Sequence, residues 1–81
     1  MKIHHIKTIM PFFYEAKQGR KTFELRKDDR HYQVNDILHH LLFDDGQIQG
    51  DSFYQKITYK LTCFDGLTEG YCILGVENIP E

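Results

Sequence analysis

The side chains best suited to chemistry lie in residues 19–26, Gly-Arg-Lys-Thr-Phe-Glu-Leu-Arg. Lys21 carries a mobile point charge, whereas the planar guanidinium of Arg26 suits two-point recognition of a phosphate or a base edge. Glu24 precedes Arg26 by two residues, so on a strand both side chains project from one face, about 7 Å apart. The glutamate can accept a hydrogen bond from an exocyclic amine. Lys21, Glu24 and Arg26 therefore predict a clamp for a nucleotide.

The alternative for the same residues is a surface ion-pair network. Glu24 and Arg26 can pair with each other, or with Lys56 and Lys60 if these lysines lie on a neighbouring strand. Exposed ion pairs contribute little to stability. The two interpretations differ in one consequence, because only a clamp loses a ligand when Arg26 is replaced by alanine.

Residues on either side of the motif extend the predicted site. Arg20 follows Gly19, where exposed backbone N–H groups can assist anion binding. Arg30 ends the charged run 27–30, which by itself is typical of a solvated turn. We expect both arginines to contact phosphate. Tyr32 can stack on a base, as aromatic side chains do in single-strand recognition, and packing inside a barrel is its alternative.

A second acidic group comes from segment 64–71, where Glu69 stands between Gly66 and the adjacent Gly70. If the sheet closes on itself, this connection approaches the first two strands, and Glu69 comes near Lys21. A lysine and a carboxylate in a cleft can act as general acid and base when burial shifts their pKa values. The alternative is a glycine-rich turn without a chemical role.

The elements before the motif follow from periodicity and turn chemistry. Residues 3–9 are rich in β-branched side chains and predict a first strand. Pro11 suits the first position of a helix of about two turns that ends near Lys17 or Gln18. Gly19 can then take the left-handed conformation that follows many helices. The motif therefore begins where this short helix ends.

From position 22 the pattern alternates with period two, which predicts a second strand. Phe23 and Leu25 are expected to face the core, and Glu24 and Arg26 to lie on the opposite side. Three further strands and the turns between them complete the chain: strands 37–43, 53–64 and 70–76, with turns at 34–36, 44–46 and 65–66.

The later strands carry their own expectations about burial. Ile57, Tyr59 and Leu61 alternate with polar residues and should share one face, whereas residues 70–76 are nearly all apolar, as in a strand covered on both faces. Five strands and little helix predict one mainly β (α+β) domain over residues 1–81. We expect a five-stranded, partly closed barrel with one or two short helices, because closure removes edges that invite aggregation.

Charge and composition exclude several classes of protein. The net charge of −2 argues against a protein that coats nucleic acid non-specifically. Residues 17–30 nevertheless hold six of the ten lysines and arginines, so positive charge is concentrated around the motif. No apolar run approaches the roughly 20 residues needed to span a bilayer, and no secretion signal is recognisable. We therefore expect a cytoplasmic protein with no membrane partner.

Cysteines and histidines do not predict a metal site. Cys63 and Cys72 lack Cys-x-x-Cys spacing, which favours reduced structural thiols. Neighbours on a strand point to opposite faces, so neither His4-His5 nor His39-His40 can chelate a metal alone. One histidine from each pair would supply only two ligands. We expect no metal and no cofactor, and His5 is expected near the cleft as a hydrogen-bonding residue.

Spelled as Gly19-x-Lys21-x-x-Glu24-x-Arg26, the motif resembles the signature of ASCH domains, a branch of the PUA-like superfamily usually associated with RNA. More closely, the chain is similar to DUF3850, a small bacterial and phage-associated family of ASCH-like domains of unknown function. The segments that carry this resemblance cover essentially the whole chain: His5-x-Lys7 with Pro11 and Phe13, Gly19-x-Lys21-x-Phe23-Glu24-x-Arg26-Lys27-x-Asp29-Arg30, Val34-x-Asp36, Lys56-Ile57-Thr58-Tyr59, and Gly66-Leu67-x-Glu69-Gly70-Tyr71.

This resemblance implies a PUA/ASCH-like barrel with the motif in a cleft, and a module that binds RNA or another nucleotide-like ligand such as a modified nucleobase. Some ASCH-like proteins are amidohydrolases of acylated cytidine that use a lysine, a threonine and a glutamate. Glu24 stands where they have threonine, and Thr22 is about 7 Å out of register. An amidohydrolase would thus depend on Lys21 and Glu69. A third interpretation is a small protein-interaction domain of prophage origin.

Two positions depart from the family pattern. Asn35 stands where the family tends to have glycine, which is a mild change because asparagine also accepts left-handed geometry. Leu41-Leu42 stands where the third strand usually continues with an Arg-Glu pair. A ligand contact that the family makes through this pair does not carry over directly to this chain.

Overall fold

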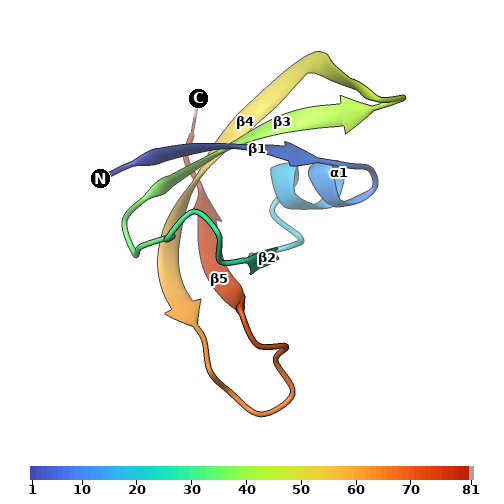
Figure 1. Cartoon of the computed structure of the whole chain (residues 1–81). Coiled ribbons are helices and arrows are strands. Elements are labelled where there is room, and N and C mark those ends of the chain that lie inside the picture. Colours follow the sequence, from blue (N-terminus) through green and yellow to red (C-terminus); the bar gives the residue numbers. More distant parts are fainter. Residues whose placement is uncertain (81) are drawn as a thin grey trace.

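A computed structural model describes residues 1–80, which form one curled sheet and one helix (Figure 1). The sheet bends into a five-stranded half-barrel, and the mainly β prediction is therefore confirmed, with one helix where one or two were expected. The elements follow in chain order: β1 (Ile3–Thr8), α1 (Phe12–Lys17), β2 (Phe23–Lys27), β3 (Ile37–Asp44), β4 (Gln47–Leu61) and β5 (Tyr71–Asn78).

The strand order in the sheet is β1-β3-β4-β5-β2, so β1 and β2 form its two edges. β1 runs parallel to β3, and the other neighbours are antiparallel. The two edges approach each other as the sheet curls, and side chains connect them. Arg26 Nη2 of β2 lies 3.4 Å from the carbonyl oxygen of Lys7, and Arg30 Nη1 donates to that of His5 at 2.6 Å. Arginines thus bridge the gap in the half-barrel.

Helix α1 closes one end of this half-barrel. Six residues are too few to form a stable helix alone, so packing must hold it in place. Phe13 and Ala16 are fully buried against Phe53 of β4, with the two phenyl rings edge to face at 5.0 Å. Gly19 follows with φ +83°, as predicted for a left-handed exit. The chain therefore leaves α1 at a fixed point and enters β2.

The main core lies on the concave face of the sheet. It joins alternate residues of the strands with Tyr32 from the β2–β3 connection. Burial of apolar area contributes about 25 cal/mol per Å², so each of these buried side chains stabilises the fold. Its members are Ile6, Tyr32, Leu38, Ile57, Cys72, Leu74 and Val76.

The expected faces of β2 are reversed. Phe23 and Leu25 are 50% and 57% exposed, whereas Glu24 is only 3% exposed. The cause is the pairing of β2 with β5, where Glu24 lies opposite the buried Leu74. Directly paired residues project from the same face of a sheet. The polar side chains of β2 therefore enter the concave side, and the prediction that Phe23 and Leu25 belong to the core is wrong.

Two expectations for the later strands also fail. A bulge at Thr58 shifts the register between Ile57 and Tyr59, so Ile57 is buried and Tyr59 is exposed. An extra residue in one strand exchanges the faces of everything beyond it. In β5 the odd-numbered residues are not buried, so this strand is covered on one face instead of two.

The local turn chemistry is confirmed. Asn35 has φ +80° in the turn before β3, and Asp45 and Gly46 have positive φ in the β3–β4 hairpin. Cys72 is buried as a structural thiol, but Cys63 is exposed in the β4–β5 loop and does not fit the buried role. Within residues 1–80, no helix is long and apolar enough to cross a membrane.

Candidate functional site

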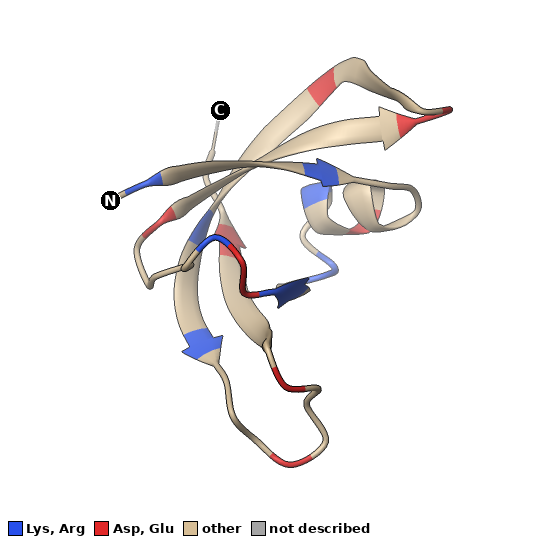
Figure 2. Ribbon diagram, viewed as in Figure 1, with Lys and Arg blue, Asp and Glu red and all other residues tan. Residues whose placement is uncertain are grey.

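A cleft of about 530 Å³ opens between the two edge strands, next to α1. Its walls come from residues 7–9 at the end of β1, Phe12 of α1, Lys21, and residues 23–26 of β2. Figure 2 shows basic segments at the end of β1 and along β2 that face each other across the gap. The motif predicted from the sequence therefore lies in a hollow of the surface, where the curled sheet leaves its edges apart.

Glu24 is the centre of this cleft. Lys21 Nζ donates to its Oε2 at 2.7 Å, and Arg26 Nε donates to its Oε1 at 3.1 Å. Charge-assisted hydrogen bonds of this kind offset the cost of burying a carboxylate. Because two cations share one anion, the three side chains carry one net positive charge. The ion pair expected between Glu24 and Arg26 is therefore present, and both residues line the cleft.

The position of Lys21 follows from the helix exit. Lys21 lies two residues after Gly19, and Lys21 Nζ also donates to the carbonyl oxygen of Phe23 at 2.7 Å. The same ammonium lies 4.9 Å from the ring centroid of Phe23 and 5.9 Å from that of Phe12, both within cation–π range. These two rings are about half exposed. The cationic centre is thus flanked by two accessible aromatic rings.

Arg26 reaches from β2 across to β1. Its Nη2 lies 3.3 Å from Thr8 Oγ1 and 3.4 Å from the carbonyl oxygen of Lys7. Thr8 pairs with Leu42 in the parallel β1–β3 register, and Leu42 packs under α1 beside Phe13. The second leucine of the departure Leu41-Leu42 therefore supports the helix and does not line the cleft.

A buried chain of hydrogen bonds starts at Thr8 and runs behind the cleft. Thr8 Oγ1 lies 2.8 Å from Nδ1 of His40, and His40 Nε2 lies 2.7 Å from Oε1 of Gln55. Gln55 Nε2 donates to Asn78 Oδ1 at 2.8 Å, and Asn78 Nδ2 donates to the carbonyl oxygen of Ala16 at 3.0 Å. This chain links the cleft to the last turn of α1.

His40 is fully buried at the middle of this chain, stacked on Phe53 at 4.4 Å between ring centroids. Burial lowers its pKa to about 4, against the opposing influence of Glu24. The imidazole is therefore neutral at pH 7. Among the described residues, every buried side-chain nitrogen and oxygen has a hydrogen-bond partner, so the polar interior is fully satisfied.

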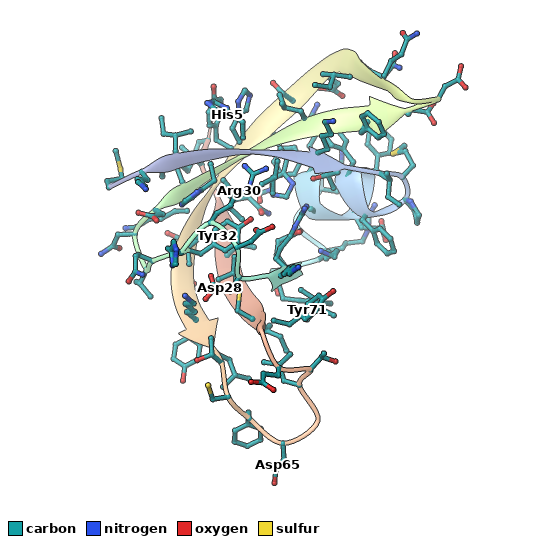
Figure 3. The ribbon with its side chains drawn as sticks, viewed as in Figure 1. His5, Asp28, Arg30, Tyr32, Asp65 and Tyr71 are labelled. Atoms are coloured by element: carbon teal, nitrogen blue, oxygen red, sulfur yellow. The ribbon has the colours of Figure 1, made fainter. Side chains whose placement is uncertain are left out.

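The flanking residues predicted for the site lie around the cleft without lining it. Arg20 is exposed and donates to Glu15 at 2.6 Å, which raises the pKa of the guanidinium through that hydrogen bond. Arg30 lies beside β1, as Figure 3 shows. Tyr32 is only 2% exposed and contacts His4 edge to face at 4.8 Å. Its ring has no free face for a base, so the packing alternative is the correct one.

The predicted pairing of Lys21 with Glu69 is wrong. Lys21 precedes β2 and Glu69 precedes β5, and these strands are antiparallel. The two side chains therefore lie beyond opposite ends of a ladder of five residue pairs, about 13 Å long. Glu69 instead lines a separate cavity of about 600 Å³ at the β4–β5 loop, with Asp28 and Lys60. Figure 3 shows this loop extending away from β2, with Asp65 at its far end.

The lysines offered as alternative partners of the motif are engaged elsewhere or lie on another strand. Lys60 Nζ lies 2.8 Å from Asp28 Oδ2 and donates to the carbonyl oxygen of Tyr32 at 2.7 Å. The hydrogen bond from Lys60 lowers the pKa of Asp28. Lys56 pairs with Ile37 in β3. The ion pairs around Glu24 are therefore local to the cleft.

The histidines of β1 and β3 lie on the two faces of the sheet. His5 lies on the convex side and contacts His39, with their Nδ1 atoms 2.9 Å apart, so its expected place near the cleft is wrong. His4 is buried and bonds Asp36 at 2.9 Å. In the part of the chain that the structure describes, no group of three or more histidine, cysteine or acidic side chains can hold a metal ion.

Sequence reasoning missed Thr8, His40 and Phe12 as members or supports of the site. The sequence does contain a signal for Thr8 and His40. Both are polar residues at positions where the alternation of β1 and β3 places side chains inside. Polar groups at such positions are buried only with hydrogen-bond partners. Their pairing joins residues 32 positions apart, which periodicity cannot show.

The model of a family described as "Domain of unknown function (DUF3850)" matches residues 3–76. The matched range includes all of β1, α1, β2, β3 and β4 and most of β5, together with every residue that lines the cleft. No curated protein matches the chain.

Proposed function

This chain belongs to the DUF3850 family, and on that premise we propose that it is an ASCH/PUA-like module that binds RNA or a modified nucleobase. One observation carries the proposal. Glu24 is buried at the base of an open cleft with Lys21 and Arg26 at hydrogen-bond distance, which leaves one net positive charge facing solvent. A partly buried cationic cluster that lines an open cleft favours an anionic ligand.

The cleft suits one nucleotide in three respects. Lys21 and Arg26 have N–H groups beyond those used by Glu24, and these can donate to phosphate oxygens. Phe12 and Phe23 offer exposed rings on which a base can stack, a contact worth about 1–3 kcal/mol per base. The volume of the cleft, about 530 Å³, lies in the usual range for small-ligand sites.

Further phosphates of a longer strand would meet the exposed arginines beside the cleft. Arg20 follows directly on the helix exit, and Arg30 lies on the β1 side. Both side chains are exposed, and their present partners, Glu15 and the His5 carbonyl oxygen, are at the surface. We assign these two arginines to flanking phosphates, and Lys21 and Arg26 to the nucleotide in the cleft.

Binding is favoured over hydrolysis by the arrangement of the same residues. Glu24 stands where the hydrolytic ASCH-like proteins have threonine, and its two oxygens are engaged by cations. The carboxylate that would assist Lys21 lies in another cavity. An acid and a base must reach the same substrate atoms within about 3 Å, which these two residues do not.

Replacement of Lys21 by alanine tests the proposal. We expect Lys21→Ala and Arg26→Ala each to weaken binding of a fluorescent single-stranded RNA about tenfold, because each removes a charge-assisted hydrogen bond. If Lys21 contacts phosphate, the slope of log affinity against log salt should also become less steep by about 0.7 in Lys21→Ala. Fluorescence anisotropy at several salt concentrations measures both quantities.

Lys2→Ala is the charge-matched control, since it removes one positive charge from an exposed residue outside the cleft. It should change affinity by less than about twofold, as expected for a distant surface charge screened by salt. Unchanged affinity and slope in both cleft variants would refute the assignment of the site.

A further inference from the structure

The chain of hydrogen bonds behind the cleft has a fixed direction. Its inner end is the carbonyl oxygen of Ala16, which can only accept, so Asn78 must donate through Nδ2 and accept through Oδ1. Gln55 then donates to Asn78 through Nε2 and offers Oε1 to His40. Each side-chain amide is therefore held in one orientation by the next group.

The same logic fixes the tautomer of His40. Because Gln55 presents an oxygen, His40 must carry its proton on Nε2. The lowered pKa of about 4 means that no second proton is present at pH 7. Nδ1 is thus an acceptor, and the hydroxyl of Thr8 has to donate to it at 2.8 Å. The proton of Thr8 is committed to the interior.

Thr8 Oγ1 consequently faces the cleft with lone pairs only. Arg26 Nη2 lies 3.3 Å from this oxygen and 3.4 Å from the carbonyl oxygen of Lys7. If Arg26 turns toward a phosphate, both oxygens lose this donor. A buried acceptor without a partner is unfavourable, so a ligand that brings an N–H group to this place gains affinity, and one that brings a carbonyl oxygen loses it.

We propose that Thr8 is a specificity-determining residue, which selects a nucleotide whose base presents an amino group over one that presents a carbonyl oxygen at the same position. The inference rests on the proposed function, because it requires a nucleotide in the cleft. Rejection arises from an unpaired or repelled polar group, which discriminates more strongly than a change in apolar contact. Glu24, with spare lone pairs beside Lys21 and Arg26, supports the same preference.

The test uses two pairs of ligands that differ mainly in this group: cytidine and uridine 5′-monophosphate, and adenosine and inosine 5′-monophosphate. For the natural chain, isothermal titration should give about tenfold tighter binding of the amino member in at least one pair. Thr8→Val keeps the shape and removes the oxygen, so the preference should fall to within about twofold of unity. Thr8→Ser keeps the hydroxyl and should retain it.

The outcomes separate the two claims. If neither member of either pair binds, the proposed function fails, and this inference fails with it. If the members of both pairs bind with equal affinity to the natural chain, the inference fails and the proposed function stands. If circular dichroism shows that Thr8→Val is folded and the variant keeps the preference for the amino ligand, Thr8 is not the source of this preference. If Thr8→Val does not fold, Thr8→Ser decides the test. Loss of the preference in Thr8→Ser overturns the assignment of Thr8, and retention of the preference in Thr8→Ser supports the assignment.

Discussion

Phe13→Ala is expected to lower the free energy of unfolding by about 3–5 kcal/mol, the usual cost of removing a fully buried phenyl ring. The ring is completely buried between Ala16 and Phe53, with Leu42 beside it. A domain of 81 residues has a total stability of roughly 4–12 kcal/mol, so this one substitution removes a large part of it. Urea denaturation followed by circular dichroism measures the change.

The neighbouring residue supplies a matched control. Phe12 belongs to the same turn of α1 but is 48% exposed at the cleft. Phe12→Ala should change the free energy of unfolding by less than about 1 kcal/mol, because much of its surface is already in water. Equal effects of the two substitutions would show that α1 is not held by the Phe13 cluster.

Loss of Phe13 should also affect the cleft. Helix α1 is held to the sheet by this cluster and by the bonds from Asn78 Nδ2 to the carbonyl oxygens of Ala16 and Lys17. The helix determines where Gly19 turns the chain and hence where Lys21 meets Glu24. If the cleft binds RNA as proposed, we expect Phe13→Ala to weaken that binding even at temperatures where the variant is fully folded.

Acid is expected to destabilise the protein by about 3 kcal/mol between pH 6.5 and pH 4, mainly through His40. Burial holds the pKa of this residue near 4, whereas histidine in the unfolded chain has its ordinary value of 6.5. In this window the unfolded state binds a proton that the folded state excludes. Stability therefore falls as pH falls, by about 1.4 kcal/mol per unit.

The variant His40→Gln isolates this contribution. Glutamine can keep a donor toward Gln55 and an acceptor toward Thr8, but it does not titrate. We expect denaturation curves of His40→Gln to lose most of their pH dependence between pH 6.5 and pH 4. A slope as steep as that of the natural chain would contradict the assignment, whatever the absolute stability of the variant.

Other titratable groups contribute to the pH dependence of stability, either at a different pH or to a smaller extent than His40. Burial also lowers the pKa of His39, which contributes in the same direction as His40. Hydrogen bonds from Lys60 and Lys17 lower the pKa values of Asp28 and Asp51, so their contribution is lost at a more acidic pH. His31→Asn, a change at an exposed residue with φ +53°, serves as the control histidine variant.

Features of the fold that depend on local chemistry could be predicted from the sequence. Gly19 and Asn35 take positive φ because glycine has no Cβ and the short polar side chain of asparagine tolerates this geometry, and alternation identifies the strands on either side. The position of the motif after a short helix follows from the same signals. Local conformational preference is encoded within a few residues, so no knowledge of distant partners is required.

Features that depend on distant partners could not be predicted. Alternation shows that Phe23 and Glu24 lie on opposite faces, but the partner strand decides which face is inside. Pairing of Glu24 with Leu74 turns the carboxylate inward, and the cations on either side of it stabilise that choice. The assumption that apolar residues face the core therefore failed at the very strand that carries the site.

The same limitation explains the error with Glu69. Closure of the partly closed barrel was expected to bring the last connection next to Lys21, but the antiparallel pairing of β5 with β2 sends that connection to the far end of β2. Thr8 and His40 were missed because their contact spans 32 residues. A buried polar position in one strand predicts that a partner exists, but not where it lies.

The open seam between β1 and β2 has a mechanical consequence. The four ladders of the sheet pass around the half-barrel, whereas the two edge strands are tied across by the side chains of Arg26 and Arg30. Widening the seam therefore stretches side-chain bonds and leaves the ladders intact. The half-barrel is thus held around its circumference by backbone ladders and, along the seam, by the side chains of these two arginines.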